Sequence, residues 1–223
     1  MPTHQSLSGT TDQELLQRMI ETHPDRFGAD YWGFFDAHVA PLLPAVPTLI
    51  DIGCGPALLL RDFARRFPTA VLCGYDLTPA MIDHGQKMAW PGAKPTLKVH
   101  NAATEPLPHG AGTVHLVSMS SVLHVLDEPL PVLAEIRRVL APGGVFLLND
   151  WVRMPLPAYL AWRRETLREG EVENIGRGFR LFPAHAKYTS EDWRWLLGHA
   201  GFAVRIQTRL RPTHEIFVAV AGS

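Results

Sequence analysis

Glycines and an acidic residue cluster where a short apolar run ends. The run Thr48–Ile52 contains Asp51 near its end and is followed by Gly53, Cys54 and Gly55. Glycines directly after a buried strand permit a tight turn and leave room for a ligand, because they carry no Cβ. A helix that begins just beyond such a loop offers backbone N–H groups that have no partner within the helix. This segment therefore predicts a ligand-binding loop, and the alternative is a tight turn that binds nothing.

A second acidic residue, Asp76, ends the next predicted strand, about 20 residues further along the chain. A carboxylate at a strand end can accept two hydrogen bonds from the neighbouring hydroxyls of a ribose, although it can also cap the helix that follows. The dinucleotide fingerprint G-x-G-x-x-G/A fits poorly, because Leu58 occupies its third position. The pattern acidic-x-Gly-x-Gly-x-small fits instead, with Ala57 as the small residue.

Predicted strands and helices alternate through the middle of the chain, which is typical of βαβ units with a parallel sheet. A Pro-Gly-Gly segment at 142–144 is expected to end one of the helices, and Asp127 is expected to cap its start. We expect a Rossmann-like, doubly wound α/β fold whose mostly parallel seven-stranded sheet ends in an antiparallel hairpin, with helical lid elements. The expected strands are 48–52, 70–75, 96–100, 114–118, 145–148, 202–209 and 215–220.

The whole chain, residues 1–223, is expected to form one domain. Residues 1–45 read as an N-terminal helical lid, which contains a capping box at Thr11 and Glu14 and a dense aromatic patch. The predicted cofactor-binding core is 46–150, an insertion at 151–190 is a second lid, and 191–223 hold a last helix and the hairpin.

The pattern from Asp51 to Ala57 resembles the first motif of class I S-adenosylmethionine-dependent methyltransferases, of the type that act on small molecules. The resemblance continues in order through 75–82, 101–102, 122–127 and 142–144, and spans roughly residues 48–150. The chain departs from the family where Asn101 replaces the usual acid and where His115 replaces a common Asp.

The resemblance implies S-adenosyl-L-methionine as the cofactor. Asp51 or a nearby carbonyl would hold its amino group, Gly53 and Gly55 would admit the methionine moiety, and Asp76 would bind the ribose. The cofactor-binding set is completed by Cys54, Leu77, Met81, Asn101, Ala102 and Ser118.

Candidate catalytic residues lie at the edge of the sheet where open α/β folds bind ligands. His124 follows the fourth predicted strand and could act as a base or orient the substrate, or else be a buried structural histidine. Asp150 ends the fifth strand and could contact substrate, cap a helix or form an ion pair. His185 and Tyr188, which precede a helix cap at Thr189, complete the set.

Aromatic and arginine residues of the two lids could stack on a flat ring and clamp a carboxylate, although a solvated helix with core aromatics would look similar. No Cys or His pair has the spacing of zinc ligands, so no metal site is expected. The candidate substrate-binding residues are Tyr31, Trp32, Trp151, Arg153, Tyr159 and Trp162.

The composition of the chain limits the kinds of molecule that it is expected to bind. Lys and Arg total 21 against 22 for Asp and Glu, so no basic field is available for a nucleic acid. No apolar run is long enough to span a membrane, and the first residues lack the basic and apolar regions of a signal peptide. The two cysteines, Cys54 and Cys73, fit a reducing compartment, so we expect a cytoplasmic protein. We expect it to be a monomer or a homodimer.

The expected function is S-adenosylmethionine-dependent methylation of a small molecule that is aromatic or carries a carboxylate, as in natural-product or secondary metabolism. Two alternatives remain at this point. One is an NAD(P)-dependent oxidoreductase, and the other is a catalytically silent cofactor-binding partner subunit.

Overall fold

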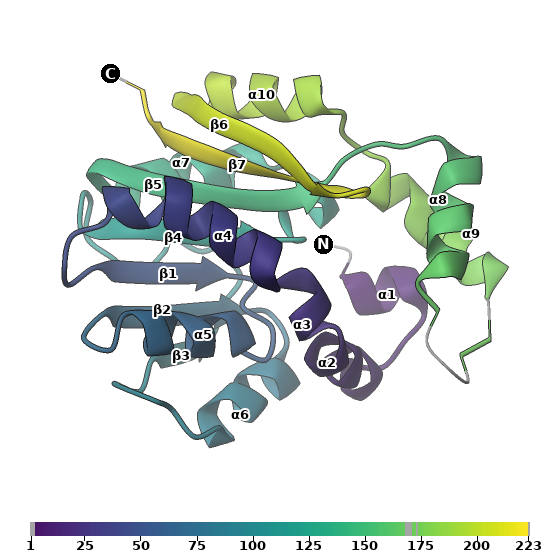
Figure 1. Cartoon of the computed structure of the whole chain (residues 1–223), viewed down its shortest axis with the longest axis horizontal. Coiled ribbons are helices and arrows are strands. Elements are labelled where there is room, and N and C mark those ends of the chain that lie inside the picture. The colour runs from purple at the N-terminus through teal and green to yellow at the C-terminus, as the bar shows by residue number, and fades with distance from the viewer. Residues whose placement is uncertain (1–2, 168–170, 173, 223) are drawn as a thin grey trace.

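The computed structural model describes residues 3–167, 171–172 and 174–222, and its centre is a seven-stranded sheet (Figure 1). The order is β3-β2-β1-β4-β5-β7-β6. Strands β1 to β5 are parallel, and β7 pairs antiparallel with both β5 and β6, so the predicted fold class is confirmed. The strands are β1 (Thr48–Ile52), β2 (Val71–Asp76), β3 (Thr96–Val99), β4 (Val114–Ser120), β5 (Leu140–Trp151), β6 (Phe202–Arg211) and β7 (His214–Ala221).

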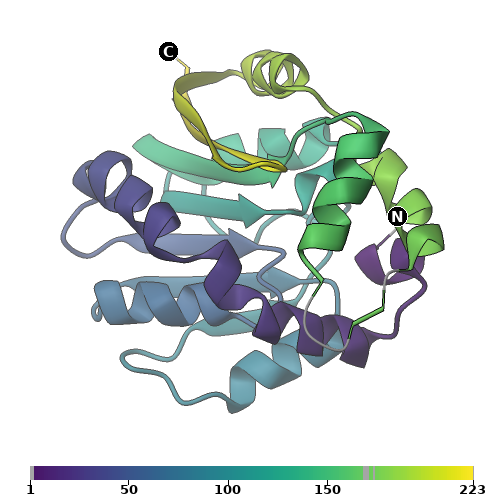
Figure 2. The same cartoon turned by 45° about the vertical axis from the view of Figure 1, so that its right-hand side comes forward.

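The helices fall into two groups, one packed on the sheet and one gathered beyond the carboxyl ends of the parallel strands. Figures 1 and 2 show α1, α2, α3, α8 and α9 in the second group. The helices are α1 (His4–Ser8), α2 (Asp12–Glu21), α3 (His23–Arg26), α4 (Ala29–His38), α5 (Leu58–Arg66), α6 (Pro79–Lys87), α7 (Leu130–Val139), α8 (Leu156–Glu165), α9 (Ile175–His185) and α10 (Ser190–His199), with short 3-10 turns η1 (Ala40–Leu42) and η2 (Leu123–Val125).

Both faces of the sheet are buried, because successive strand residues point to opposite sides. Leu49 of β1 packs with α4, α5 and α6 on one face, whereas Ile50 packs with α7 and α10 on the other. Trp193 of α10 is fully buried in the second layer, where its indole N–H donates to the Trp151 carbonyl at 2.8 Å. These two layers hold the strand ends in fixed relative positions.

Helix α4 belongs to the core, whereas the sequence predicted a lid over all of residues 1–45. Tyr31 and Phe35 are 2% and 0% exposed, and the Phe35 ring centroid lies 5.4 Å from that of Phe63 in α5. Trp32 packs edge-on against Phe63 and is covered by the guanidinium of Arg66. Large aromatic side chains bury the most apolar area, which draws this helix onto the sheet and leaves only α1–α3 at the strand ends.

The bounds of α7 and β5 also differ from the prediction. Helix α7 begins at Leu130 with Pro129 rather than Asp127 at its N-cap. It ends at Val139, and β5 starts at once, so the Pro-Gly-Gly segment lies within the strand's bounds, with Gly143 at a φ of 76°. Pro131 lies in the first turn of this helix, where the fixed backbone torsion and missing N–H of proline are tolerated. Within the described residues, no helix has the length and apolar character needed to cross a bilayer.

Replacing Phe35 tests whether α4 is core. Because the side chain is fully buried, Phe35→Ala should lower the free energy of unfolding by about 3–5 kcal/mol in urea denaturation. Leu42→Ala is the matched control, since Leu42 of η1 is 50% exposed and should change stability by less than about 0.5 kcal/mol. Similar small losses for both variants would show that α4 is not part of the core.

Candidate functional site

A cavity of about 620 Å³ lies at the carboxyl ends of the parallel strands, under the helices α1, α2, α8 and α9. The strand-end loops line one part of it, and helical residues line the rest. Of the residues predicted for the site, those that line the cavity are Asp51, Gly53, Cys54, Gly55, Asp76, Leu77, Met81, Asn101, Ala102, Trp151, Trp162 and His185.

The other predicted site residues do not line this cavity, for different reasons. Tyr31 and Trp32 belong to the core layer of α4. Four others lie behind the residues that line the cavity: Ser118, His124, Asp150 and Tyr159. Ser118 bonds to Asp51 and Tyr159 bonds to His185, both of which line the cavity, whereas His124 and Asp150 bond to each other. Arg153 and Tyr188 belong to the junction between β5 and α10, as described below.

The glycine loop has the strained backbone that its sequence requires. Gly53 and Gly55 have φ angles of 68° and 52°, and Ala57, at 60°, precedes α5. The N–H groups of Gly53 and Cys54 donate to the carbonyl of Tyr75 at 2.7 and 3.1 Å, which binds the loop to β2. A Cβ on Gly53 would lie 2.2 Å from a Val122 methyl carbon, so only glycine fits there. At Gly55 a Cβ would meet nothing within 4 Å, which leaves the backbone open to a ligand.

Asp76 both shapes this loop and faces the cavity. Its carboxylate accepts from the N–H of Gly55 at 2.8 Å and from the N–H of Thr78 at 2.9 Å. Burial raises the pKa of Asp76 above its usual range, and the two backbone donors oppose that shift. An ionised carboxylate has about four acceptor positions, so two backbone bonds leave room for a ribose. Thus the two interpretations of Asp76, as a turn residue and as a ribose ligand, are compatible.

Asp51 is a buried acid beside the loop. It is 3% exposed, and the hydroxyl of Ser118 donates to its Oδ1 at 2.6 Å. Burial raises the pKa of Asp51 to about 7, while the charge of Arg26 lowers it. Ser118 therefore acts on the cavity through Asp51. A cationic group placed next to Asp51 would restore its charge.

Helix α1 closes the cavity over the loop that follows β2. The side-chain amide of Gln5 donates to the Thr78 hydroxyl at 2.9 Å and to Asp12 Oδ1 at 3.2 Å. Thr78 is the N-cap of α6 by position, but its side chain makes no capping bond to the helix. Sequence reasoning missed Gln5, because only the fold brings residues this far apart into contact.

The two departures from the family pattern have structural explanations. The Asn101 side-chain oxygen accepts from the N–H of Ala103 at 3.2 Å and closes a turn at the cavity wall. Next to it, His100 lines the cavity, and its buried Nε2 has no hydrogen-bond partner among the described residues. His115 Nδ1 accepts from the N–H of Thr48 at 3.0 Å, so this histidine fixes the start of β1.

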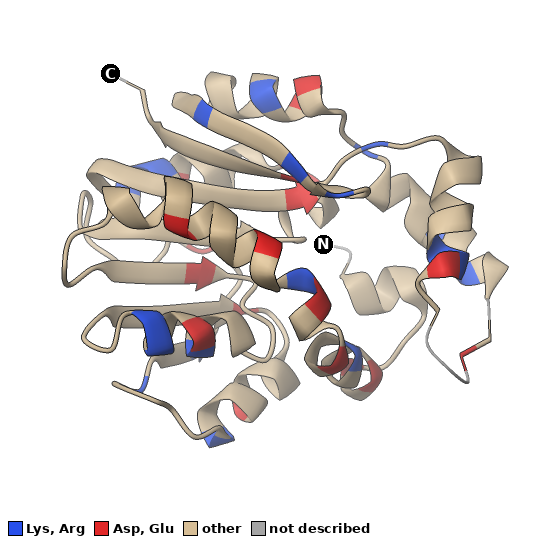
Figure 3. Cartoon of the chain, viewed as in Figure 1, with Lys and Arg blue, Asp and Glu red and all other residues tan. Residues whose placement is uncertain are grey.

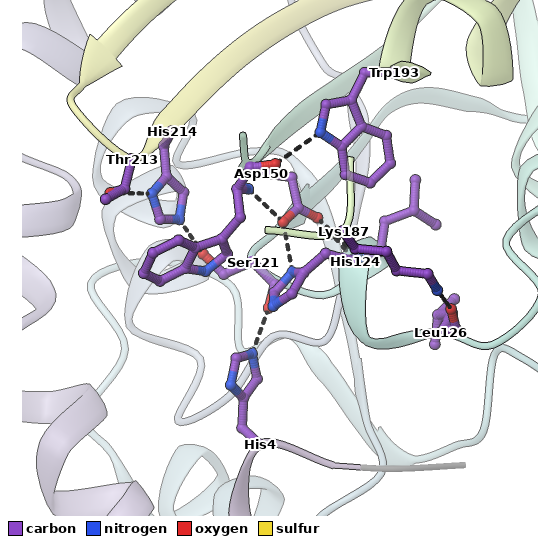
Figure 4. Close-up of polar contacts among 11 residues, drawn as sticks. His4, Ser121, His124, Leu126, Asp150, Lys187, Trp193, Thr213 and His214 are labelled. Atoms are coloured by element: carbon purple, nitrogen blue, oxygen red, sulfur yellow. Dashed lines mark hydrogen bonds and ion pairs between the residues drawn. The ribbon is translucent and has the colours of Figure 1, made fainter. Parts of the chain in front are cut away.

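His124 and Asp150 form a fully buried pair, 1% and 0% exposed (Figure 4). His124 Nδ1 lies 2.6 Å from Asp150 Oδ1. The other carboxylate oxygen accepts from the N–H groups of Leu123 and His124 at 2.9 and 3.4 Å, and Oδ1 also accepts from the N–H of Trp151 at 2.7 Å. With Nδ1 held by the carboxylate, the remaining nitrogen of His124 is Nε2, which is buried and has no partner among the described residues.

Two further histidines meet His124. The ring centroids of His4 and His185 lie 5.0 and 5.5 Å from that of His124, and 5.7 Å from each other. His185 stacks on Trp151 with the centroids 3.6 Å apart, and its Nδ1 lies 2.8 Å from the Tyr159 hydroxyl. His4 Nε2 lies 3.2 Å from the Ser121 carbonyl, as Figure 4 shows. We call His4, His124 and His185 the histidine cluster.

Burial keeps the imidazoles of His4 and His185 neutral near pH 7 by lowering their pKa. It lowers the pKa of His4 to about 4, with a smaller effect from His124, and lowers the pKa of His185 well below its usual range. The neighbouring His214, whose Nε2 lies 2.8 Å from the Ser121 hydroxyl, has its pKa lowered in the same way. A neutral imidazole has one nitrogen lone pair, which can accept a hydrogen bond, a proton or a metal ion. Sequence spacing gave no sign of His4, since it lies far from the other two along the chain.

Arg153 and Tyr188 join the end of β5 to α10. The Arg153 guanidinium donates to the carbonyls of Ala186 and Lys187 at 2.7 and 2.9 Å. The Arg153 N–H donates to the Tyr188 carbonyl, and the Tyr188 ring packs 4.5 Å from Trp193. These contacts position His185 rather than the cavity contents.

Three arginines line the cavity and have a pKa lowered by burial. The pKa of Arg26 and of Arg211 falls to about 10, and that of Arg177 also falls. The Nε atoms of Arg26 and Arg177 are buried without a hydrogen-bond partner among the described residues. Donors of this kind favour an anionic ligand.

Comparisons with known proteins agree with this geometry. Residues 50–148 match the family model described as a methyltransferase domain. The chain is 37% identical over 112 residues to a malonyl-[acyl-carrier protein] O-methyltransferase of Hahella chejuensis, covering 48% of this chain and 38% of that protein. It is 28% identical over 214 residues to the tRNA 5-carboxymethoxyuridine methyltransferase of Escherichia coli strain K12, covering 94% and 76%. The match to the Hahella protein thus spans well under two thirds of its length.

The fold has a solved counterpart. An S-adenosylmethionine-dependent methyltransferase from Mesorhizobium loti superposes with a TM-score of 0.61 at 21% identity, covering 86% of this chain and 98% of that one. Residues 50–148 therefore match a methyltransferase-domain model, in a chain that has the fold of this S-adenosylmethionine-dependent methyltransferase from Mesorhizobium loti.

Proposed function

We propose that this chain transfers a methyl group from S-adenosylmethionine to a small molecule that carries a carboxylate. The observation that carries the proposal is that one cavity is lined both by the glycine loop with Asp51 and Asp76 and by Trp151 with His185. We assign the first part of this lining to the cofactor, as the cofactor end, and the second to the acceptor, as the acceptor end.

The residues at the cofactor end fit an adenosyl sulfonium compound. The open backbone at Gly55 and the acceptor positions left on Asp76 suit a methionine chain and a ribose, respectively. The raised pKa of Asp51 suits a cationic amino group, which would favour the carboxylate form of this residue. When bound, S-adenosylmethionine supplies an electrophilic methyl group on a positively charged sulfur.

We propose that the acceptor end positions the acceptor and offers it the nitrogen lone pairs of neutral imidazoles. In-line displacement requires the nucleophile, the methyl carbon and the sulfur to be collinear, and positioning of this kind can supply about 7–11 kcal/mol. Trp151 and Trp162 line the cavity as a T-shaped pair with centroids 5.4 Å apart, and aromatic faces attract a cation. His185 lines the same wall, and His124 lies behind it, held by Asp150. We assign His185 to the part of the cavity wall that faces the acceptor, and His124, Asp150 and Tyr159 to the contacts that hold this part of the wall in place.

Two observations favour a carboxylate on the acceptor. Arg26, Arg177 and Arg211 line the cavity, and burial lowers the pKa of each, so an anion there would stabilise their charge. The Hahella and Escherichia relatives are named for a malonyl and a carboxymethoxyuridine acceptor, and both of these groups contain a carboxyl.

Transfer RNA is the competing acceptor, because the Escherichia relative acts on one by its name. The charge distribution favours a small molecule. The net charge is −1, and Figure 3 shows acidic and basic residues side by side along helices such as α2 and α5. A nucleic acid backbone is normally bound by a basic patch.

An acceptor screen tests the proposal. Full-length protein with S-adenosylmethionine should release S-adenosylhomocysteine, measured by mass spectrometry, with a small carboxylate or aromatic carboxylate. The same assay should give none with bulk transfer RNA. Turnover on transfer RNA alone would overturn the small-molecule acceptor. Cofactor binding without turnover on any acceptor would favour a catalytically silent subunit.

The ribose assignment of Asp76 predicts a defined loss of affinity. Asp76→Asn removes the charge from the hydrogen bonds to the ribose and should weaken S-adenosylmethionine binding by about 1.5–3 kcal/mol in calorimetry. Asp83→Asn, at an exposed position of the neighbouring helix α6, is the control and should leave the affinity unchanged. Equal affinities for the two variants would reject the assignment.

The buried acid Asp51 predicts a pH dependence of the apoprotein. Its pKa of about 7 lies above the ordinary value of 3.8, so between pH 4 and 7 the folded state holds a proton that the unfolded state has lost. This group therefore lowers stability by up to about 1.4 kcal/mol for each pH unit as the pH rises through that window. Asp51→Asn should abolish that slope, so the variant should gain stability over the wild type from pH 4.5 to 7.5 in urea unfolding. A constant difference between the two proteins over this range would show that Asp51 does not titrate there.

A further inference from the structure

The histidine cluster has the arrangement of a metal site. His4, His124 and His185 each offer one ring nitrogen, and these nitrogens all lie within 4.8 Å of one another. They come from three separate elements, α1, η2 and α9. His124 Nε2 and His185 Nε2 are buried without a hydrogen-bond partner among the described residues. Buried polar atoms almost always have a partner, so two orphaned nitrogens at one point indicate a ligand between them.

The outer contacts of the three rings strengthen this interpretation. A histidine that binds a metal usually donates its other ring N–H to a carboxylate, a carbonyl or another oxygen, which fixes the tautomer. His124 Nδ1 has Asp150 at 2.6 Å, and His4 Nε2 has the Ser121 carbonyl at 3.2 Å. His185 Nδ1 has the Tyr159 hydroxyl at 2.8 Å. Each ring thus has one nitrogen engaged with an oxygen and the other left for the centre of the cluster.

We propose that His4, His124 and His185 bind one divalent transition-metal ion of the zinc type, with an open coordination position facing the cavity. Three neutral imidazoles suit zinc, and three protein ligands with a free position are typical of catalytic rather than structural zinc. His4 and His185 both line the cavity, so the open position lies at the acceptor end. An acceptor oxygen, nitrogen or sulfur bound there would lose its proton more readily.

The distances require only a small contraction. Because the three nitrogens lie no more than 4.8 Å apart, an ion at their centre would lie at most about 2.8 Å from each, whereas zinc binds imidazole nitrogen at about 2.0–2.1 Å. Each nitrogen must therefore move inward by at most about 0.7 Å, which small side-chain rotations supply. Asp150 is not a ligand, because both of its oxygens are engaged by His124 and by backbone N–H groups.

Zinc binding to the full-length protein tests the site. After removal of any purification tag and treatment with a chelator, calorimetry should show one zinc ion bound per chain. The melting temperature should rise by about 5–10 °C at a free zinc concentration of about 100 times Kd. Cobalt should bind in its place and give the visible absorption of a tetrahedral, nitrogen-coordinated ion.

Variants locate the ion. His185→Gln and His4→Gln should each weaken zinc binding at least 100-fold, and Tyr159→Phe, which alters only an outer contact, should weaken it about 10- to 100-fold. His23→Gln is the matched control, because His23 is a buried, cavity-lining histidine that pairs with Asp62 away from the cluster. It should bind zinc like the wild type. Circular dichroism verifies that each variant is folded. If a variant of a ligand residue does not fold, the weaker zinc binding expected of Tyr159→Phe still tests the site.

The position of this metal site at the acceptor end rests on the proposed function. The experiments distinguish failure of the metal site from failure of that function. Absence of one-to-one binding by the wild type, or equal binding by all variants, would overturn the metal site. Methyl transfer by a protein shown to contain no metal would also count against it and would leave the acceptor proposal intact. Stoichiometric zinc binding that the ligand variants lose would support it, even if no acceptor in the screen were methylated.

Discussion

The carboxylate of Asp150 anchors the part of the cavity wall that carries Trp151 and His185. It is fully buried at the end of β5, and it holds η2 through two backbone N–H groups and His124 through the imidazole. A buried carboxylate is tolerated only when its acceptor positions are filled, so these bonds must form together. Because β5 lies between β4 and β7, the pair is anchored to an interior strand of the sheet. The cavity wall that carries Trp151 and His185 depends on this anchor.

The glycine-loop side of the cavity could be predicted from the sequence because its determinants are local. A glycine with a positive φ, an acid at a strand end and a helix start lie within short spans, and each has its own residue signature. The positions of Gly53, Gly55 and Asp76 at the cavity followed from those signatures. The sheet followed from the alternation of strands and helices, with errors mainly at boundaries such as Leu130 and Leu140, where tertiary contacts decide.

The part of the cavity next to the histidine cluster could be predicted only in part, because its determinants are not local. His124, Asp150 and His185 were candidates by their place at strand and helix ends, yet nothing in the spacing linked them to His4. Aromatic residues gave the least information, since the same types build cores and line cavities. Tyr31 and Trp32 fill the layer between α4 and the sheet, whereas Trp151 and Trp162 line the cavity, and only the packing distinguishes the two pairs.

Helix α1 ties together two parts of the cavity wall that are far apart in the sequence. Its adjacent residues His4 and Gln5 contact the Ser121 carbonyl after β4 and the Thr78 hydroxyl after β2. Both contacts come from one helix of five residues, so displacing α1 would remove them together. The cover that α1 gives to the glycine-loop side of the cavity is therefore coupled to the packing of the histidine cluster.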